Sequence, residues 1–491
     1  MTRFYFVAAL ILTLAVRLYL SKNYYTINND GVSYVEVARH FWQGQWVEAL
    51  ASYFAPLFPL MIDVIYPLLG EWELAGQFWP FTLGVFMLLP LFGLLRVIYG
   101  PKVAQLALIF YAVSPYLARL SLHVRSEIPY IFFFLLAVYL LQKSVKRGSL
   151  LPLFLTGLCS ALAYLLRPEG VGLIIVASLF LFYRRWARKE HHKVWPQVAA
   201  LYLGFIVFSF PYLFYLRWDT GNWMISRKTT VVFSYGIAEY DPTAEGISAN
   251  GSDIGGAIAV IAERPIIYAQ KVVVDTFRSI GVYLEALHYS YLPFLFVGWF
   301  FFFRGRFWEK EDFFLALCVI FYLVTFALFT VNRRFAVPLV PLSLGWVSVG
   351  YLTVSEYFHS KWGRKGRLCS WLLLVFFFAV TLPKTLKAIG REKLYLREAG
   401  NYLKGKPEQP VILTTNGRVA FYAEGKNRVL IKNSNDFPGI LASQESDYLA
   451  LDEKTFANLE HSLDSDKWLL DEEFSNWRGE KLFVLRQVRA K

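Results

Sequence analysis

The chain has 491 residues, of which 56% are hydrophobic and 18% charged, and its formal net charge is +13. A soluble domain carries roughly 25% charged residues. This composition, together with uncharged stretches such as IFFFLLAVYLL and WLLLVFFFAV, therefore excludes an ordinary soluble protein and predicts membrane-spanning helices.

Several motifs of soluble enzymes are missing from the sequence. It contains no Gly-rich phosphate loop followed by Lys, no GxSxG, no HExxH and no paired CxxC, so a nucleotide-driven pump or a soluble-type hydrolase is poorly supported. Cys159, Cys318 and Cys369 lie within or at the end of apolar segments and are expected to be packing residues.

Spans of roughly 17–25 mainly apolar residues recur along the chain and predict about eleven transmembrane helices. The first apolar segment is followed by no small-residue cleavage site, so it is expected to be a retained helix rather than a signal peptide. The predicted spans are 4–20, 78–98, 103–119, 127–142, 150–165, 169–183, 195–216, 291–303, 312–330, 335–355 and 368–383.

The segments between these spans alternate in character, which predicts the topology. One set is short and rich in Lys and Arg, as in QKSVKRGS, YRRWARKEHHK and HSKWGRKGR. The positive-inside rule places this set and the amino terminus in the cytoplasm. The other set, which includes the long loops 21–77 and 217–290, is then expected on the outer face. The excess of positive charge is therefore attributed to cytoplasmic loops rather than to nucleic-acid binding.

The last hundred residues differ from the rest. Short β-branched runs alternate with Gly and Asn turns in PVILTTNGRVAFYAEGKNRVLIKN, and LYLREAGNYLKG has the spacing of an amphipathic helix. The sequence thus predicts a transmembrane domain over 1–383 and a small α/β domain over 384–491. An odd number of spans places that second domain on the outer, periplasmic side.

A set of polar residues lies at the predicted outer ends of the spans. Four of them are arginines, in three separate loops where the positive-inside rule predicts few cations. Because Arg binds phosphate through a fixed fork of donors, the set indicates a lipid-linked phosphate or diphosphate. Alternatively, these arginines pair with nearby glutamates or reach towards lipid headgroups. The residues are Asp30, His123, Arg125, Glu127, Arg167, Glu169, Arg333 and Arg334.

Asp30 follows the first span and precedes GVSYVEVARHF, a short amphipathic helix with Tyr34 one turn further on. An Asp in this place is suited to cap the helix and is equally well placed for catalysis, and the two roles are compatible. The aromatic residues around it would stack on a sugar face or anchor to headgroups.

Given these residues, the chain resembles the GT-C glycosyltransferases, in particular bacterial relatives of the protein O-mannosyltransferases and aminoarabinose transferases. Ala38, Arg39 and Gly44 match the A-R-x-L-x-x-G pattern of the first outer loop, with Phe41 in place of Leu. SEIPYIFFFLLAVYLL, LAYLLRPEGVGLIIV and NRRFAVPLVPLSLGWVSVGY are similar to later elements, in the same order. The usual acidic pair is reduced here to Asp30 alone, and Phe335 stands where Tyr is common.

The resemblance implies an integral-membrane glycosyltransferase of a bacterial inner membrane, acting at its outer face. It would move a hexosyl or pentosyl group from a polyprenyl-phosphate donor to a hydroxyl of a lipid, glycan or protein acceptor, with inversion. Asp30 would be the general base. Arg125, Arg167, Arg333 and Arg334 would stabilise the departing phosphate, and His123, Glu127, Glu169 and Tyr34 would line the donor site. No cofactor is expected, although a divalent metal is left open.

Two other functions are considered. A polysaccharide ligase or polymerase would share the outer cavity and the arginines. A flippase or transporter of lipid-linked sugars would need polar groups near the bilayer midplane and commonly two repeated halves, and the sequence displays neither.

Overall fold

The computed structural model describes residues 2–187, 194–241, 261–406, 410–429, 446–459, 463 and 467–488. The chain forms two compact units. Unit 1 contains residues 1–19 and 37–387, and unit 2 contains residues 20–36 and 388–491. Unit 2 therefore combines the carboxyl-terminal residues with a short segment from the first predicted outer loop, which includes Asp30.

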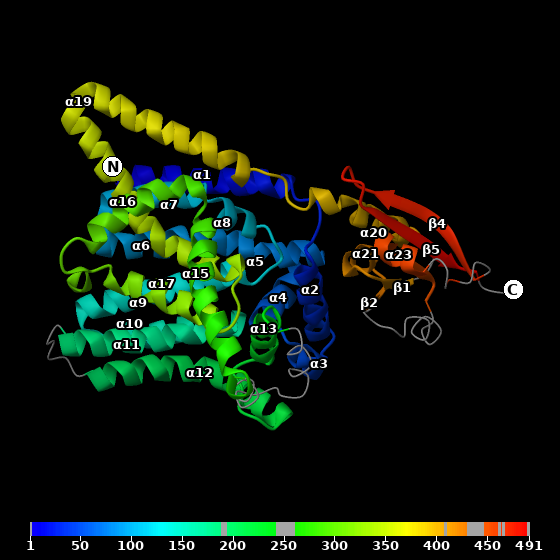
Figure 1. Cartoon of the computed structure of the whole chain (residues 1–491). Helices are drawn as coiled ribbons and strands as arrows, with labels where there is room; N and C mark the ends of the chain where they lie inside the picture. The colour runs from blue at the N-terminus through cyan, green and yellow to red at the C-terminus, as the bar shows by residue number, and fades with distance from the viewer. Residues whose placement is uncertain are drawn as a thin grey trace. The chain divides into compact units, whose positions relative to one another are not determined.

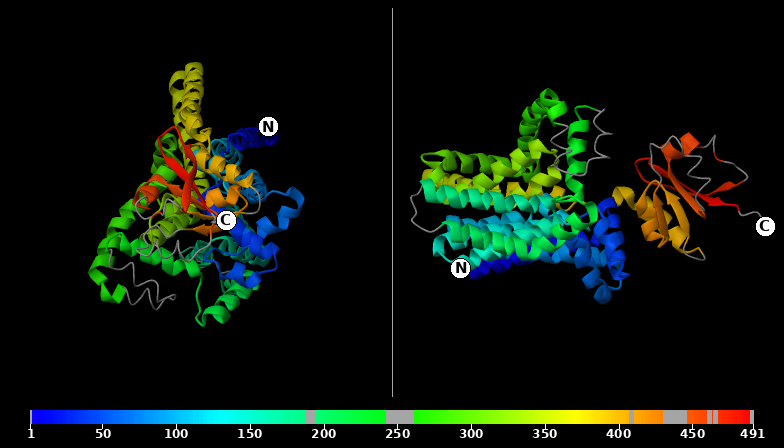
Figure 2. Two further views of the ribbon diagram at one scale, coloured as in Figure 1. Left: turned by 90° about the vertical axis from the view of Figure 1, so that its right-hand side faces the viewer. Right: turned by 90° about the horizontal axis from the view of Figure 1, so that it is seen from below.

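Unit 1 is helical (Figure 1). Its helices α9, α10 and α12 lie side by side, and two views of the ribbon agree on this arrangement (Figures 1 and 2). Two helices, α1 (Thr2–Lys22) and α2 (Asn29–Trp42), have residues in both units. The other helices of unit 1 are α3 (Trp46–Ala51), α4 (Leu57–Leu69), α5 (Trp72–Phe86), α6 (Leu88–Tyr99), α7 (Pro101–Ala112), α8 (Pro115–Leu120), α9 (Glu127–Arg147), α10 (Leu150–Leu166), α11 (Val171–Ala187), α12 (Val194–Thr220), α13 (Arg227–Ala238), α15 (Pro265–Leu287), α16 (Leu292–Phe303), α17 (Phe313–Leu328), α18 (Arg333–Ala336) and α19 (Val340–Thr385).

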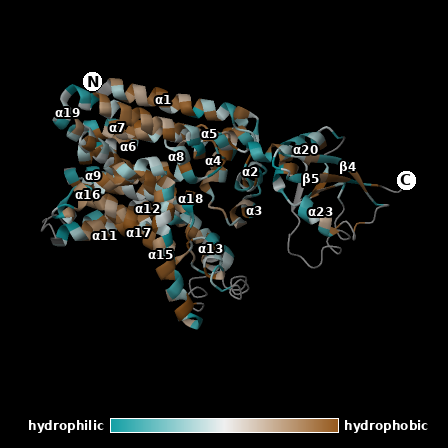
Figure 3. Ribbon diagram, turned by 45° about the horizontal axis from the view of Figure 1, so that its top comes forward, coloured by the Kyte–Doolittle hydropathy of each residue, from teal (hydrophilic) through white to brown (hydrophobic). Residues whose placement is uncertain are grey.

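Many of these helices have the character of membrane spans, with hydrophobic residues along their lengths (Figure 3). In the described part of the chain, five helical segments are long and apolar enough to cross a membrane, or six if α15 and α16, bent by 88° at their junction, form one span. Three shorter apolar helices, α4, α10 and α17, accompany them. The protein is thus a multi-pass membrane protein, and the number eleven stays a prediction.

The last two predicted spans, 335–355 and 368–383, form the two arms of α19. Gly363 interrupts this element with non-helical backbone angles (φ 52°, ψ −119°). A positive φ is a conformation that glycine adopts readily and other residues seldom do. The basic sequence HSKWGRKGR surrounds this bend, in agreement with the prediction of a connection between two helices there.

Glycines allow two helix pairs in unit 1 to pack closely. A Cβ atom on Gly157 of α10 would lie 2.0 Å from the Leu201 carbonyl oxygen of α12, and one on Gly204 of α12 would lie 2.0 Å from the Phe154 carbonyl oxygen of α10. Gly298 and Gly350 play the same part between α16 and α19. Such small-residue contacts are typical of membrane helices, because lipid supplies no hydrophobic force to drive helix association and van der Waals packing must do so.

In the part of the chain that the structure describes, unit 2 contains a five-stranded sheet in the order β2-β1-β3-β5-β4. The sequence predicted an α/β fold for these carboxyl-terminal residues, but not the strand order. β1 is parallel to β2 and β3, and β5 is antiparallel to β3 and β4. The strands are β1 (Val411–Thr414), β2 (Lys426–Val429), β3 (Tyr448–Asp452), β4 (Trp468–Ser475) and β5 (Lys481–Gln487), and the helices are α20 (Leu394–Lys404), α21 (Gly417–Tyr422) and α23 (Glu453–Leu459).

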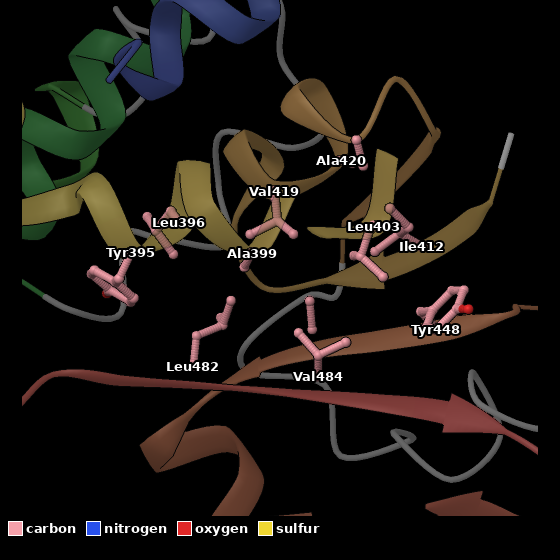
Figure 4. Close-up of a cluster of buried hydrophobic side chains, with 12 residues drawn as sticks. Tyr395, Leu396, Ala399, Leu403, Ile412, Val419, Ala420, Tyr448, Leu482 and Val484 are labelled. Carbon is pink, nitrogen blue, oxygen red and sulfur yellow. The ribbon is translucent and has the colours of Figure 1, made fainter. Parts of the chain in front are cut away.

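The two faces of this sheet are covered by different helices. Alternate strand residues point to opposite faces, so Ile412 and Val484 pack against α20 and α21 (Figure 4), whereas Leu413 and Leu485 pack with Leu459 of α23. Burial of both faces explains why β1 and β3 are almost continuously apolar in sequence.

Candidate functional site

The R-P-E-G sequence forms a tight turn between α10 and α11. Arg167 is extended (φ −155°, ψ 134°), as the residue before a proline prefers to be, and it ends α10. Residues 168–170 form one turn of 3₁₀ helix. Gly170 is required sterically, because a Cβ atom there would lie 2.3 Å from the Tyr164 backbone nitrogen. The turn thereby places Arg167 and Glu169 at the same end of the helix bundle.

The two arginines of N-R-R-F diverge at the start of α18. Asn332 caps this helix, its side-chain oxygen accepting a hydrogen bond from the Arg334 backbone N–H at 3.0 Å. Successive helical residues are about 100° apart around the axis, so the side chains of Arg333 and Arg334 point in different directions. Arg334 turns towards Glu127, and the Arg333 guanidinium lies 4.7 Å from the ring centroid of Tyr116.

Glu127 binds two guanidinium groups through one carboxylate oxygen. Its Oε1 accepts from Nε and Nη2 of Arg334 at 2.8 and 2.6 Å and lies 3.3 Å from Nη1 of Arg167. Arg167 in turn donates to Glu169 at 2.9 Å. The side chains of Glu127 and Arg167 are 1% and 5% exposed, whereas those of Glu169 and Arg334 are 21% and 33% exposed, so the ion cluster has a buried centre and a partly exposed edge. The arginines thus pair with the glutamates, which was the alternative left open by the sequence.

Two carboxylate oxygens of this cluster lack a donor among the described residues. Oε2 of Glu127 and Oε2 of Glu169 are buried and accept no hydrogen bond within that part of the chain. A buried acceptor without a donor costs about 1–3 kcal/mol, which makes these oxygens suited to accept from hydroxyl groups of a ligand.

Lys228 is a site residue that the sequence interpretation missed. It lies in the first turn of α13, whose cap is Ser226. Burial lowers the pKa of Lys228, the positive charge of Arg167 lowers it further, and Glu169 opposes the shift. The pKa of Glu169 also falls below its usual range: burial would raise it, but the positive charges of Arg167 and Lys228 outweigh that effect. Three cations, Arg167, Arg334 and Lys228, thus face two carboxylates.

A signal for Lys228 was present in the sequence. Arg227 and Lys228 form a basic pair within the segment 217–290, which the positive-inside rule assigns to the outer face. Like the four arginines in short loops, this pair is an excess of positive charge on the side where few cations are expected. It differs from them in lying within a long loop rather than at the end of a predicted span.

A pocket of about 370 Å³ opens beside this cluster. Glu169 and Lys228 supply its polar edge, and its walls come from α11, α13, α17 and α18. The walls are mainly aromatic and aliphatic and include Phe321, Tyr322, Phe326, Phe329 and Phe335. An apolar pocket with a few charged groups at one end is the form expected of a binding site for an amphiphile. We refer to it below as the apolar pocket.

His123 and Arg125 belong to the same region of unit 1, in the connection before α9. Burial lowers the pKa of His123 to about 3, and the positive charges of Arg125 and Arg119 contribute to the shift. The imidazole is therefore uncharged at neutral pH. It can donate or accept a hydrogen bond there, but it adds no positive charge to the cluster.

Arg333 lies in a second pocket, of about 670 Å³, lined by residues of α8, α15 and α19 and of the turn that follows α15. We call it the basic pocket, because Lys384 and Lys387 line it together with Arg333. Among the described residues, Glu285 is the one acid that lines it; this side chain lies 3.9 Å from Arg333 and is 64% exposed. The predicted arginines thus lie in separate places, because Arg167 and Arg334 bind Glu127 whereas Arg333 lines the basic pocket.

Asp30 and Tyr34 belong to unit 2. The expectation that Asp30 caps its helix is wrong: α2 begins at Asn29, and the cap is Asn28, whose side-chain oxygen accepts from the Gly31 N–H at 2.8 Å. Asn caps as well as Asp does. Asp30 is partly exposed in the first turn, where the helix dipole favours a negative charge. Tyr34 is 4% exposed.

The segment just before α2 is held by the carboxyl-terminal part of unit 2. The Tyr422 hydroxyl accepts from the Ile27 N–H at 2.8 Å, and Arg397 donates to the Tyr25 carbonyl at 2.9 Å. Tyr24 pairs with Ile389 in a short parallel bridge. Asp30 therefore follows a segment whose backbone groups bond to the sheet domain.

Among the residues that the structure describes, no group of three or more His, Cys, Asp or Glu side chains is arranged to hold a metal ion. The polar groups gathered in unit 1 are instead mostly cations and their carboxylate partners.

Comparison with known proteins gives a consistent result. Residues 54–215 match the family described as dolichyl-phosphate-mannose-protein mannosyltransferase. No curated protein sequence matches the chain. ArnT from Cupriavidus metallidurans in the apo state superimposes with a TM-score of 0.63 at 13% identity, over 97% of each chain. The chain has the GT-C fold. This confirms the fold class and the resemblance predicted from the sequence.

Other GT-C structures agree over nearly the whole length. ArnT bound to undecaprenyl phosphate gives a TM-score of 0.59 at 12% identity and covers 97% of both chains. The Archaeoglobus fulgidus oligosaccharyltransferase AglB, in complex with an inhibitory peptide and a dolichol-phosphate, gives 0.58 at 12% identity over 98% of this chain and 74% of its own. The lipid ligands bound in these two structures are undecaprenyl phosphate and a dolichol-phosphate.

Proposed function

We propose that this GT-C protein is a glycosyltransferase that moves a sugar from a polyprenyl-phosphate donor to a hydroxyl acceptor at the outer face of a bacterial inner membrane. The observation that carries the proposal is the position of the apolar pocket beside the cluster of Arg167, which is buried, and Arg334 and Lys228, which are partly buried. The apolar pocket suits a lipid tail, and the cluster of cations suits a phosphate. Structural neighbours with undecaprenyl phosphate and dolichol-phosphate support this class of donor.

The charges of the cluster suit a phosphate. Arg167 and Arg334 are held in place by Glu127, so little side-chain entropy is lost when they meet a ligand. Lys228 pairs with no carboxylate of the described residues, so its charge is left for the phosphate. Fixed cations in a desolvated site stabilise negative charge that grows in the transition state more strongly than water does. The orphaned oxygens of Glu127 and Glu169 would accept from sugar hydroxyls.

In the proposed reaction, the Asp30 carboxylate removes the proton of the acceptor hydroxyl. The acceptor oxygen forms a bond to the anomeric carbon while the bond between that carbon and the phosphate oxygen breaks. The bonding electrons leave with the lipid phosphate, and attack from the opposite side inverts the configuration. A general base contributes about 10²–10⁴-fold to the rate. Arg125 and His123 would complete the polar edge, and no step requires a bound metal.

The test uses membranes supplied with a radiolabelled polyprenyl-phosphate sugar and measures transfer and donor binding separately. Asp30→Asn should reduce transfer by about 10²-fold or more and leave donor binding unchanged. Lys228→Gln should weaken donor binding. Glu48→Gln removes an exposed acid of the same outer segment and should change neither. Undiminished transfer by the Asp30 variant would contradict the role of Asp30 as general base. Undiminished donor binding by the Lys228 variant would contradict the assignment of the donor site to the apolar pocket and its cations.

The same assay separates this function from its rivals. A flippase would move the labelled lipid across the membrane without breaking the sugar–phosphate bond. A ligase or polymerase would act on an oligosaccharide donor and leave a single-sugar donor untouched. Appearance of free polyprenyl phosphate in step with labelled acceptor is expected only for the proposed transferase.

A further inference from the structure

We infer that the basic pocket of unit 1 is a second phosphate site, which binds the phosphate monoester headgroup of a lipid-anchored molecule other than the sugar donor. The inference rests on the proposed function only in that the apolar pocket is taken as the donor site.

The charge of the pocket is strongly unbalanced. Arg333 of α18 lines it together with Lys384 and Lys387 at the end of α19, and Glu285 is the one acid among the lining residues that the structure describes. The contact between Arg333 and Glu285 is long, at 3.9 Å, and both side chains are about half exposed or more. An exposed pair of this kind contributes about 0–1 kcal/mol, so it holds the guanidinium only weakly. Stacking on Tyr116, with the cation 4.7 Å from the ring centroid, leaves the N–H edge of Arg333 available to an anion.

The turn at the edge of the pocket has an unusual backbone. His288 lies between α15 and α16 with φ 73° and ψ 140°, a conformation that residues other than glycine seldom adopt. Such strain persists where the surroundings enforce it, and it is concentrated at functional sites. Here the His288 ring is fixed by a 2.9 Å hydrogen bond with Ser290, which is itself 2.8 Å from Thr381. The result is a rigid wall for the pocket.

The remaining lining indicates a lipid-anchored ligand rather than a free ion. Leu284, Leu292 and Val380 contribute apolar surface next to the cations. Tyr289 is 64% exposed, and its ring lies tilted at 35° to the His288 ring with the centroids 4.0 Å apart. Cations at one end of an apolar, aromatic surface match a phosphate on a sugar or an acyl chain.

The experiment uses the full-length protein in nanodiscs of zwitterionic phosphatidylcholine and titrates dodecyl phosphate by isothermal calorimetry. The wild-type protein should bind two equivalents. Lys384→Gln combined with Lys387→Gln should weaken one of them by about tenfold or more, whereas Lys228→Gln should weaken the other. Lys361→Gln combined with Lys365→Gln removes the same charge from exposed positions of α19 outside both pockets and should change neither.

The arms of this titration distinguish the possible failures. If only the Lys228 variant lowers the stoichiometry, the basic pocket is not a phosphate site. If only the Lys384 and Lys387 variant lowers it, the donor site fails and the basic pocket stands. An equal loss of bound dodecyl phosphate in the Lys361 and Lys365 variant would show a general effect of charge and contradict the inference.

Two further arms address the chemistry of the ligand. Glu285→Gln removes the opposing charge and should tighten the basic site about two- to fivefold. Inorganic phosphate that binds this pocket as tightly as dodecyl phosphate would overturn the assignment to a lipid-anchored ligand. Loss of the second equivalent in phosphatidylglycerol discs would show that bulk anionic lipid occupies the pocket, which would also contradict the inference.

Discussion

Lys228 illustrates how the environment of one side chain sets a measurable property. Its pKa is lowered by burial and by Arg167, and the protonated form is the one that can bind a phosphate. A lowered pKa means that the charge is lost at a lower pH than in an ordinary lysine. Donor binding through Lys228 should therefore be complete below that pKa and weaken as the pH rises through it.

This gives a prediction for pH dependence. The kcat/KM for the polyprenyl-phosphate donor should fall on the alkaline side at a pH below 10.5, the ordinary lysine value. In Lys228→Arg the fall should move to higher pH, because a guanidinium stays protonated there. Lys361→Arg, at an exposed position of α19, should leave the profile unchanged. An identical alkaline fall in Lys228→Arg would show that another group causes it.

At the scale of elements, unit 1 depends on close contact between α10 and α12. α10 leads directly into Arg167, so a change in this packing is expected to move the turn that carries the ion cluster. In Gly204→Ala the new Cβ would lie 2.0 Å from the Phe154 carbonyl oxygen, and the helices must separate. Overpacking of this kind costs about 1–3 kcal/mol.

The prediction is a lower midpoint of thermal unfolding in detergent for Gly204→Ala, together with weaker donor binding. Gly281→Ala is the matched control, since it makes the same change inside helix α15, where no heavy atom would lie within 4 Å of the new Cβ. That variant should be neutral or gain about 0.5–1 kcal/mol from helix propensity. Equal effects of the two substitutions would mean that the glycine contact is not needed for stability.

At the scale of the whole molecule, the sheet domain holds the segment that leads to Asp30. If Asp30 is the base, this contact gives the domain a positioning role. Tyr422→Phe removes the hydrogen bond to the Ile27 N–H. Because a neutral hydrogen bond is worth about 0.5–1.5 kcal/mol, kcat should fall about two- to tenfold while donor binding stays constant.

Tyr402→Phe provides the control for this prediction. It makes the same substitution in the same domain, where the lost bonds join the hydroxyl to Asp471 and Lys406, each at 3.0 Å, and not to the segment before α2. Its kcat should match that of the wild type. A parallel fall in both variants would indicate general destabilisation of the domain instead of a specific role for Tyr422.

The sequence by itself determined the class of protein. Apolar segments long enough to span a bilayer, the alternation of basic loops and the switch to strand-like runs after residue 383 are local properties, and lipid or water acts on each segment independently. For this reason the helical membrane part, the carboxyl-terminal α/β fold and the GT-C resemblance could all be predicted. The set of polar residues at the predicted outer ends of the spans could also be found in the sequence, although it did not include Lys228.

Only the tertiary structure decided how those residues are paired. Glu127 and Arg334 are 207 positions apart and meet because α9 and α18 begin close to each other. Arg333, its neighbour in sequence, turns to the basic pocket because adjacent helical residues face different ways. The choice of Asn28 over Asp30 as cap depended on where α2 begins. Pairing of this kind follows from helix packing over long separations, which local sequence patterns do not encode.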